Sequence, residues 1–162
     1  MSQVYAAFYR GRAERFFSLA RLSDWLTRLI TRGPYSHCEL AVQQPDGQYI
    51  CYSASVRDTG VRRKIMPLPP EKWDIIPVNA SPLALEAFFH LHDDKGYDWP
   101  GALGFVLLNQ GRADRLFCSE FCAEFLRLRD SWRWSPNLLY ALVTSRETIS
   151  HDNTPDYSVD RR

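Results

Sequence analysis

The change from strand-like to helix-like patterning along the chain is the feature that most limits its fold. The first half carries short β-prone segments separated by turn signals, and strands are predicted over 3–9, 35–42, 48–54, 61–66 and 73–78. Helices are predicted over 23–32, 82–94 and 117–130, and a further short helix from 136. Strands that mostly precede helices are typical of an α+β domain, here with an antiparallel sheet of about five or six strands packed against helices.

Composition is typical of one globular domain. The 162 residues predict a single domain over 1–149 and a polar C-terminal tail over 150–162. A net charge of +1 argues against a nucleic acid as the partner. The sequence has no apolar run long enough for a transmembrane helix and does not start like a secretory signal, so a cytoplasmic location is expected. Four cysteines are too few for a disulfide scaffold and are expected to be free thiols.

Cys118 is the first candidate for chemistry, because it lies where a polar loop turns into the predicted helix over 117–130. The positive end of the helix dipole and the unpaired N–H groups there both favour a thiolate. A thiolate is the nucleophilic form of cysteine. Cys122 lies one turn later between aromatic residues, and we expect it to be a small buried apolar side chain.

His37 is the second candidate, within the predicted strand over 35–42. Strand alternation places His37 and Glu39 on one face, and Cys38 and Leu40 on the other. A histidine on a strand and a cysteine at a helix start form the usual pair of a thiol hydrolase, in which the imidazole is the general base.

A third polar group normally orients the imidazole of such a pair. We favour Glu39, because a carboxylate best stabilises an imidazolium, although a neighbour two positions along a strand need not reach the ring. Ser53 and Tyr52, on the next predicted strand, are the alternatives.

Metal binding is a competing interpretation of the same residues. A zinc site could use soft ligands from His37, Cys38, Cys51, Cys118 and Cys122. The sequence contains no Cys-x-x-Cys pair, and a strand directs adjacent side chains to opposite faces, so no metal or other cofactor is expected. His90 and His92 are two positions apart on a predicted helix and do not share a face, so we expect them at a solvated helix end.

Three short motifs together resemble a known superfamily. The segment Tyr35-Ser36-His37-Cys38-Glu39-Leu40 resembles the SHxxL/I strand of the circularly permuted NlpC/P60 superfamily of papain-like cysteine hydrolases. Gly96-Tyr97-Asp98 and Phe117-Cys118-Ser119-Glu120-Phe121 resemble its later "YD … CSE" block. The resemblance spans roughly residues 4–140, and the histidine precedes the cysteine, as in the permuted members.

The resemblance implies a permuted papain-like fold with Cys118 as nucleophile and His37 as base. Tyr35 and Tyr97 are our candidates for lining the substrate pocket. The family often has a glutamate on the strand after the histidine strand, where this chain has Tyr52-Ser53-Ala54, so Glu39 and Ser53 remain rivals for the third position. The implied reaction is cleavage of an amide or acyl bond in a peptide, a peptidoglycan or an acyl lipid.

Two other functions remain open at this point. The missing glutamate favours a binding or structural module on the same fold, in which the cysteine is no longer used. Arginines interleaved with aromatics near the N-terminus are interpreted as an ordinary, partly solvated amphipathic segment, and a lipid acyltransferase at a membrane surface is the alternative if that segment binds anionic vesicles. Compact size and the preference for arginine over lysine suit a bacterial or phage-encoded protein, and the sequence does not indicate an oligomeric state.

Overall fold

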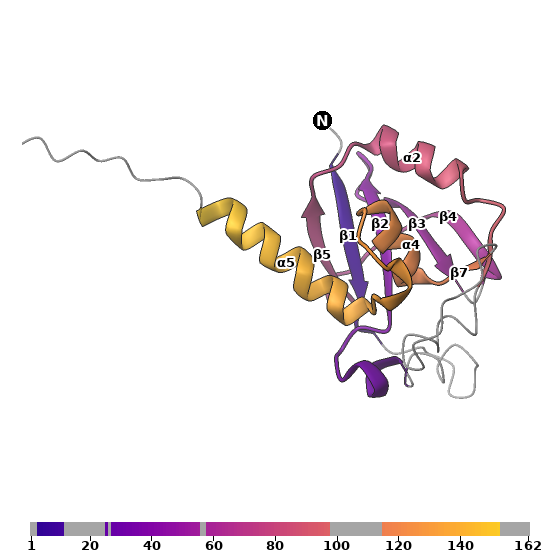
Figure 1. Ribbon diagram of the computed structural model, residues 1–162. Helices are drawn as coiled ribbons and strands as arrows, with labels where there is room; N and C mark the ends of the chain where they lie inside the picture. Colours follow the sequence, from indigo (N-terminus) through magenta and orange to yellow (C-terminus); the bar gives the residue numbers. More distant parts are fainter. Residues whose placement is uncertain (1–2, 12–24, 26, 56–57, 98–114, 153–162) are drawn as a thin grey trace, which may run out of the picture.

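The computed structural model describes residues 3–11, 25, 27–55, 58–97 and 115–152, which have an α+β fold (Figure 1). Within these residues, five strands form an antiparallel sheet in the order β5-β1-β2-β3-β4, and two short strands, β6 and β7, extend its β4 edge. The strands are β1 (Val4–Tyr9), β2 (His37–Gln43), β3 (Tyr49–Ser55), β4 (Gly60–Met66), β5 (Trp73–Val78), β6 (Gly96–Tyr97) and β7 (Arg115–Leu116). The helices are α2 (Pro82–His90), α4 (Cys118–Phe125), the 3₁₀ turn η2 (Ser131–Arg133) and α5 (Pro136–Asp152). The expected α+β class is confirmed.

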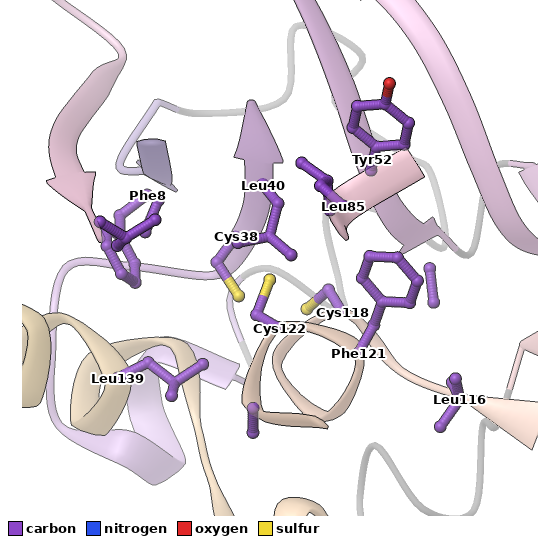
Figure 2. Close-up of a cluster of buried hydrophobic side chains, with 14 of the residues drawn as sticks. Phe8, Cys38, Leu40, Tyr52, Leu85, Leu116, Cys118, Phe121, Cys122 and Leu139 are labelled. Atoms are coloured by element: carbon purple, nitrogen blue, oxygen red, sulfur yellow. The ribbon is translucent and has the colours of Figure 1, made fainter. Parts of the chain in front are cut away.

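The helices gather on one face of the sheet, where the main core lies (Figure 1). Strand side chains that point to this face alternate along β1, β2 and β3, as the period of two requires. They meet Leu85 of α2, Phe121 of α4 and Leu139 of α5, all nearly inaccessible to solvent. Figure 2 shows several of these side chains converging on the start of α4. The same face therefore holds both the core and the predicted nucleophile.

The opposite face of the sheet carries a second, smaller cluster. Its buried members are Ala7, Ala41, Cys51, Leu68 and Trp73. The predicted alternation in β2 is confirmed, because Cys38 and Leu40 lie in the main core while Ala41 lies in this cluster. His37 and Glu39 share the parity of Ala41 and thus start from this second face, but His37 is the first residue of β2 and interacts with Cys118 around the end of the strand.

Three helix boundaries differ from the sequence prediction. α2 begins as expected, with Ser81 Oγ accepting the N–H of Ala84 at 3.0 Å, but it ends at His90 and a turn follows over 91–94. α4 ends at Phe125, because Arg127 adopts a left-handed backbone with φ of 55° and turns the chain. α5 is long and reaches Asp152, so the tail predicted from residue 150 begins inside the last turn of this helix. Of the helix predicted over 23–32, residues 25 and 27–31 are helical.

Asn137, near the start of α5, anchors the segment that leads into β2. Its Nδ2 donates to the carbonyl of Tyr35 at 2.8 Å, and its Oδ1 accepts the N–H of Tyr35 at 3.0 Å. The same Nδ2 reaches Thr31 Oγ1 at 2.6 Å. This clamp fixes the chain two residues before His37.

Replacing Asn137 with alanine should lower the free energy of unfolding by about 2 kcal/mol, because it leaves both backbone groups of the buried Tyr35 without their partner. Chemical denaturation followed by circular dichroism measures the loss. Leu138→Ala is the control, since that side chain is 55% exposed and its removal should cost less than about 0.5 kcal/mol. Equal stability of Asn137→Ala and the wild type would contradict the role of the clamp.

Candidate functional site

Cys118 is the first residue of α4, a helix that packs against β2 and β3. The preceding Phe117 is the N-cap and makes no side-chain hydrogen bond to the helix. The first N–H groups of a helix have no partner within it, so they and the helix dipole face the cysteine. The Cys118 residue is 7% exposed and belongs to the main core, and its place at the helix start favours a thiolate.

Three sulfur atoms meet at this point, from Cys38 on β2 and from Cys118 and Cys122 on α4 (Figure 2). A hydrogen bond from the Cys38 thiol is the largest influence on Cys118 and, together with the positive charge of His37, holds its pKa well below the usual value despite burial. Desolvation raises the pKa of Cys38, which therefore stays a neutral donor. Cys122 is buried in the main core, as predicted from the sequence.

The hydrogen-bond ladder between β2 and β3 stops just before this cluster. The last pair towards the site is Leu40 with Tyr52. Beyond that pair, the carbonyl of Cys38 accepts the Ser53 hydroxyl at 2.8 Å, and the Cys38 N–H donates to the sulfur of Cys118. The thiolate therefore occupies the open end of the ladder and satisfies a backbone donor that a continued strand pair would have used.

His37, the first residue of β2, lies at the same end of the sheet with its side chain 22% exposed. Its Nε2 is 3.1 Å from Oε1 of Glu39, and its ring lies edge-on to Trp73 with centroids 6.4 Å apart. Burial alone would lower the pKa of His37, but the charge and hydrogen bond of Cys118, followed by those of Glu39, raise it to about 10. These interactions favour an imidazolium opposite a thiolate.

Glu39 does reach the imidazole, although it lies only two positions along the strand. Its side chain is 1% exposed, and burial would raise the pKa of the carboxyl. Hydrogen bonds and charges of His37 and Arg62 outweigh this penalty and lower the pKa of Glu39, so the carboxylate is ionised. A buried ionised acid that holds the imidazole has the geometry of the orienting member of a catalytic triad.

Arg62 on β4 is the residue at this site that the sequence analysis missed. Its Nη1 donates to Glu39 Oε2 at 2.9 Å and its Nη2 to Oε1 at 2.5 Å, a bidentate pair. The Arg62 side chain is 13% exposed. The sequence does show an arginine within a predicted strand. Its partner Glu39 lies two strands away in the sheet, so no sequence pattern connects the two residues.

The remaining predicted residues lie elsewhere or make other contacts. Ser53 donates to backbone carbonyls and not to His37, and the Tyr52 hydroxyl donates to Glu86. Tyr35 is buried in the core, with its hydroxyl donating to Asp74 at 2.6 Å and its ring 4.5 Å from that of Tyr140. Tyr97 forms part of the short β6, next to residues 98–114, which lie outside the described part of the chain.

The cysteines and histidines do not assemble a metal site in the part of the chain that the structure describes. Cys51 lies in the second cluster, across the sheet from Cys118 and Cys122. His90 is exposed at the end of α2 and contacts Glu86 and Asp93, as expected of a solvated helix end. His92 does not fit that expectation: it lies in the following turn with its side chain only 14% exposed, packs on Phe88 and contacts Glu124.

Comparison of the chain with models of known protein families found no match, and comparisons with curated proteins and with solved structures found none either. Among the described helices, each is too short or too polar to cross a membrane. The function must therefore be argued from the site itself.

Proposed function

We propose that the protein is a cysteine hydrolase of the permuted NlpC/P60 type that cleaves an amide or acyl bond. One arrangement carries the proposal: Cys118 at the start of α4 interacts with His37, whose imidazole the buried carboxyl group of Glu39 holds in place, and these contacts favour a thiolate and an imidazolium. Cys118 is the nucleophile, His37 the acid and base, and Glu39 the residue that orients the imidazole. The lack of a glutamate on the strand after the histidine strand favoured a binding module. Glu39, on the same strand as His37, contacts the imidazole and takes the place of that missing residue.

The first half of the reaction uses the ion pair as it stands. The Cys118 thiolate attacks the carbonyl carbon, a C–S bond forms, and the oxyanion is stabilised by the backbone N–H of Cys118 at the start of the helix. The bond to the leaving nitrogen or oxygen then breaks as the imidazolium of His37 gives that atom its proton. The product is an acyl thioester on Cys118 and a neutral imidazole.

The second half restores the enzyme. Neutral His37 takes a proton from water, the resulting hydroxide attacks the thioester carbon, and the C–S bond breaks to release the acid and the thiolate. Nε2 of His37 stays with Glu39 throughout, so Nδ1 is the ring nitrogen available to the sulfur and to water. The reaction requires no cofactor.

The first test is the order in which the four thiols react with iodoacetamide. We expect Cys118 to be alkylated well before Cys38, Cys51 and Cys122 at neutral pH, because its pKa is lowered, the pKa values of Cys38 and Cys51 are raised by burial, and Cys122 is buried in the core. Peptide mapping by mass spectrometry over a time course measures the order. Cys122→Ala should leave the rate at Cys118 unchanged, and Cys118→Ser should remove the fast reaction. Slow labelling of all four thiols at one rate would favour the binding module instead.

A second experiment tests acyl transfer. With p-nitrophenyl acetate we expect a burst of p-nitrophenol and an acetyl group on Cys118, which is the pattern of an acyl-enzyme. Cys118→Ser should abolish the burst. Fast alkylation of Cys118 without acetylation would point to a reactive thiol that is not a hydrolase.

A further inference from the structure

We infer that Arg62 is a positioning residue of this site: it fixes the Glu39 carboxylate so that the carboxylate, in turn, holds the imidazole of His37. The inference rests on the proposed function and adds a fourth member to its machinery. Arg62 touches neither Cys118 nor His37 through any contact found in the described part of the chain, so it acts only through Glu39.

Strand register explains how an arginine on β4 reaches a glutamate on β2. Arg62 pairs with Ser53 on β3, and extending the β2–β3 register by one residue sets Ser53 opposite Glu39. The three residues thus form one row across neighbouring strands and share a face of the sheet. Serine is small, so the middle of the row leaves space for the guanidinium, whose Nη1 also lies 3.4 Å from the carbonyl of Cys51 on β3.

Charge balance explains why Glu39 needs a second cation besides His37. Cys118, His37, Glu39 and Arg62 alternate as thiolate, imidazolium, carboxylate and guanidinium. Without Arg62, a nearly inaccessible carboxylate would share one imidazolium with a thiolate, and burial would favour protonation of the carboxylate. A protonated Glu39 no longer stabilises the imidazolium. Arg62 therefore keeps Glu39 charged when the pH falls.

The two N–H groups that the guanidinium of Arg62 directs at Glu39 also fix the orientation of the carboxylate. Each Glu39 oxygen accepts one N–H of Arg62, and Oε1 additionally faces Nε2 of His37. Both carboxylate oxygens are thus fixed in one plane, which a single ammonium cannot achieve. Arg62 is held from its other side by Asp58, 3.3 Å from its Nε, and Asp58 is itself paired with Lys64.

Other titratable groups near the row do not account for its charge state. Glu39 faces His37, Arg62 and the Cys51 thiol, whose pKa is raised by burial so that it stays neutral. Arg62 faces Glu39, Asp58 and the same thiol. The only cation within ion-pair distance of Glu39, apart from His37, is Arg62 among the described residues.

The test measures alkylation of Cys118 by iodoacetamide from about pH 4 to about pH 9 and compares the pH at which the rate is half of its maximum. We expect Arg62→Met to move this midpoint up by about one pH unit, a tenfold change in the thiolate equilibrium. Arg62→Lys keeps the charge without the fork and should give a midpoint between the two. Arg63→Met is the matched control, because the neighbouring arginine is 49% exposed and pairs with Glu86 instead.

Coupling to Glu39 separates a positioning role from general damage. In a Glu39→Gln background the carboxylate is gone, so adding Arg62→Met should hardly move the midpoint further. This double variant also buries no unpaired charge, and Arg62→Lys, which keeps a cation beside Glu39, carries the comparison if Arg62→Met alone does not fold. The inference would be overturned if Arg62→Met and Arg62→Lys both kept the wild-type midpoint. It would also be overturned if Arg62→Met moved the midpoint as far in the Glu39→Gln background as it does in the otherwise wild-type protein. A wild-type Cys118 that reacts only at alkaline pH would instead overturn the proposed function.

Discussion

Alkylation of Cys118 in a His37→Ala variant should require alkaline pH, with the midpoint of the rate moved up by more than about two pH units to the range of an ordinary or buried thiol. The wild-type thiolate is stabilised by the positive charge of His37 and by the Cys38 thiol, against the cost of burial. Removing the imidazole leaves that cost and takes away the only cation that the structure assigns to the sulfur among its described neighbours. The midpoint is the proper measure, because a thiolate of low pKa is also a weaker nucleophile and absolute rates partly offset the change in ionisation.

His92→Ala is the matched control for this experiment. His92 also contacts a carboxylate, Glu124, at 3.3 Å, and it packs on Phe88 and Phe121 of the same core. It is not among the main influences on the pKa of Cys118, so its removal should leave the midpoint in place. Equal midpoints in His37→Ala and the wild type would show that the helix start and Cys38 alone ionise the sulfur, and the proposed general base would be lost.

Much of this site was predictable because its parts obey local rules. The alternation of β2 placed Glu39 on the face of His37, and the break between polar loop and apolar helix placed Cys118 at a helix start. These inferences need only a strand period of two and a helix N-terminus. They do not depend on how the strands pair.

The contacts that the sequence could not predict are those between strands and across faces. Arg62 reaches Glu39 over the intervening strand, which requires the β3–β4 register and a small residue at Ser53. Cys38 faces the core, opposite to His37, yet its thiol and backbone N–H both contact Cys118 because the β2–β3 ladder stops at Leu40. Strand alternation alone suggested that Cys38 and His37 contact opposite faces of the sheet. The end of a ladder is a tertiary feature that no local pattern records.

Helix lengths show the same limit. The apolar pattern after Cys118 predicted a helix to residue 130, but the left-handed backbone at Arg127 and again at Asp130, with φ of 55° and 50°, turns the chain into η2. The Leu128 N–H bonds back to the carbonyl of Ala123 at 3.0 Å and closes the end of α4. No glycine or proline marks this stop in the sequence, so it follows from packing rather than from a local signal.

Glu39→Ala should be the most destabilising single change at the site, lowering the free energy of unfolding by about 3–5 kcal/mol. It leaves the guanidinium of Arg62, 13% exposed, without the carboxylate that balances it, and it removes the acceptor of His37. Thermal or chemical unfolding at neutral pH measures the loss. Glu86→Ala is the control: it removes an ion pair with the half-exposed Arg63, worth about 1 kcal/mol or less, and the hydrogen bond from the Tyr52 hydroxyl, but it leaves no charge buried.

Two further comparisons tie this loss to the buried charge. The double variant Glu39→Ala/Arg62→Met should lose less free energy of unfolding than the two single variants lose in sum, because it removes both charges together. The contribution of Glu39 should also depend on pH. Its pKa is lower in the folded protein than in the unfolded chain, so the contribution is complete above the unfolded pKa of about 4.3 and disappears as the pH falls through the folded pKa. The stability difference between wild type and Glu39→Gln should therefore shrink in acid, and a difference that stays constant into strong acid would mean that Glu39 is not ionised in the folded protein.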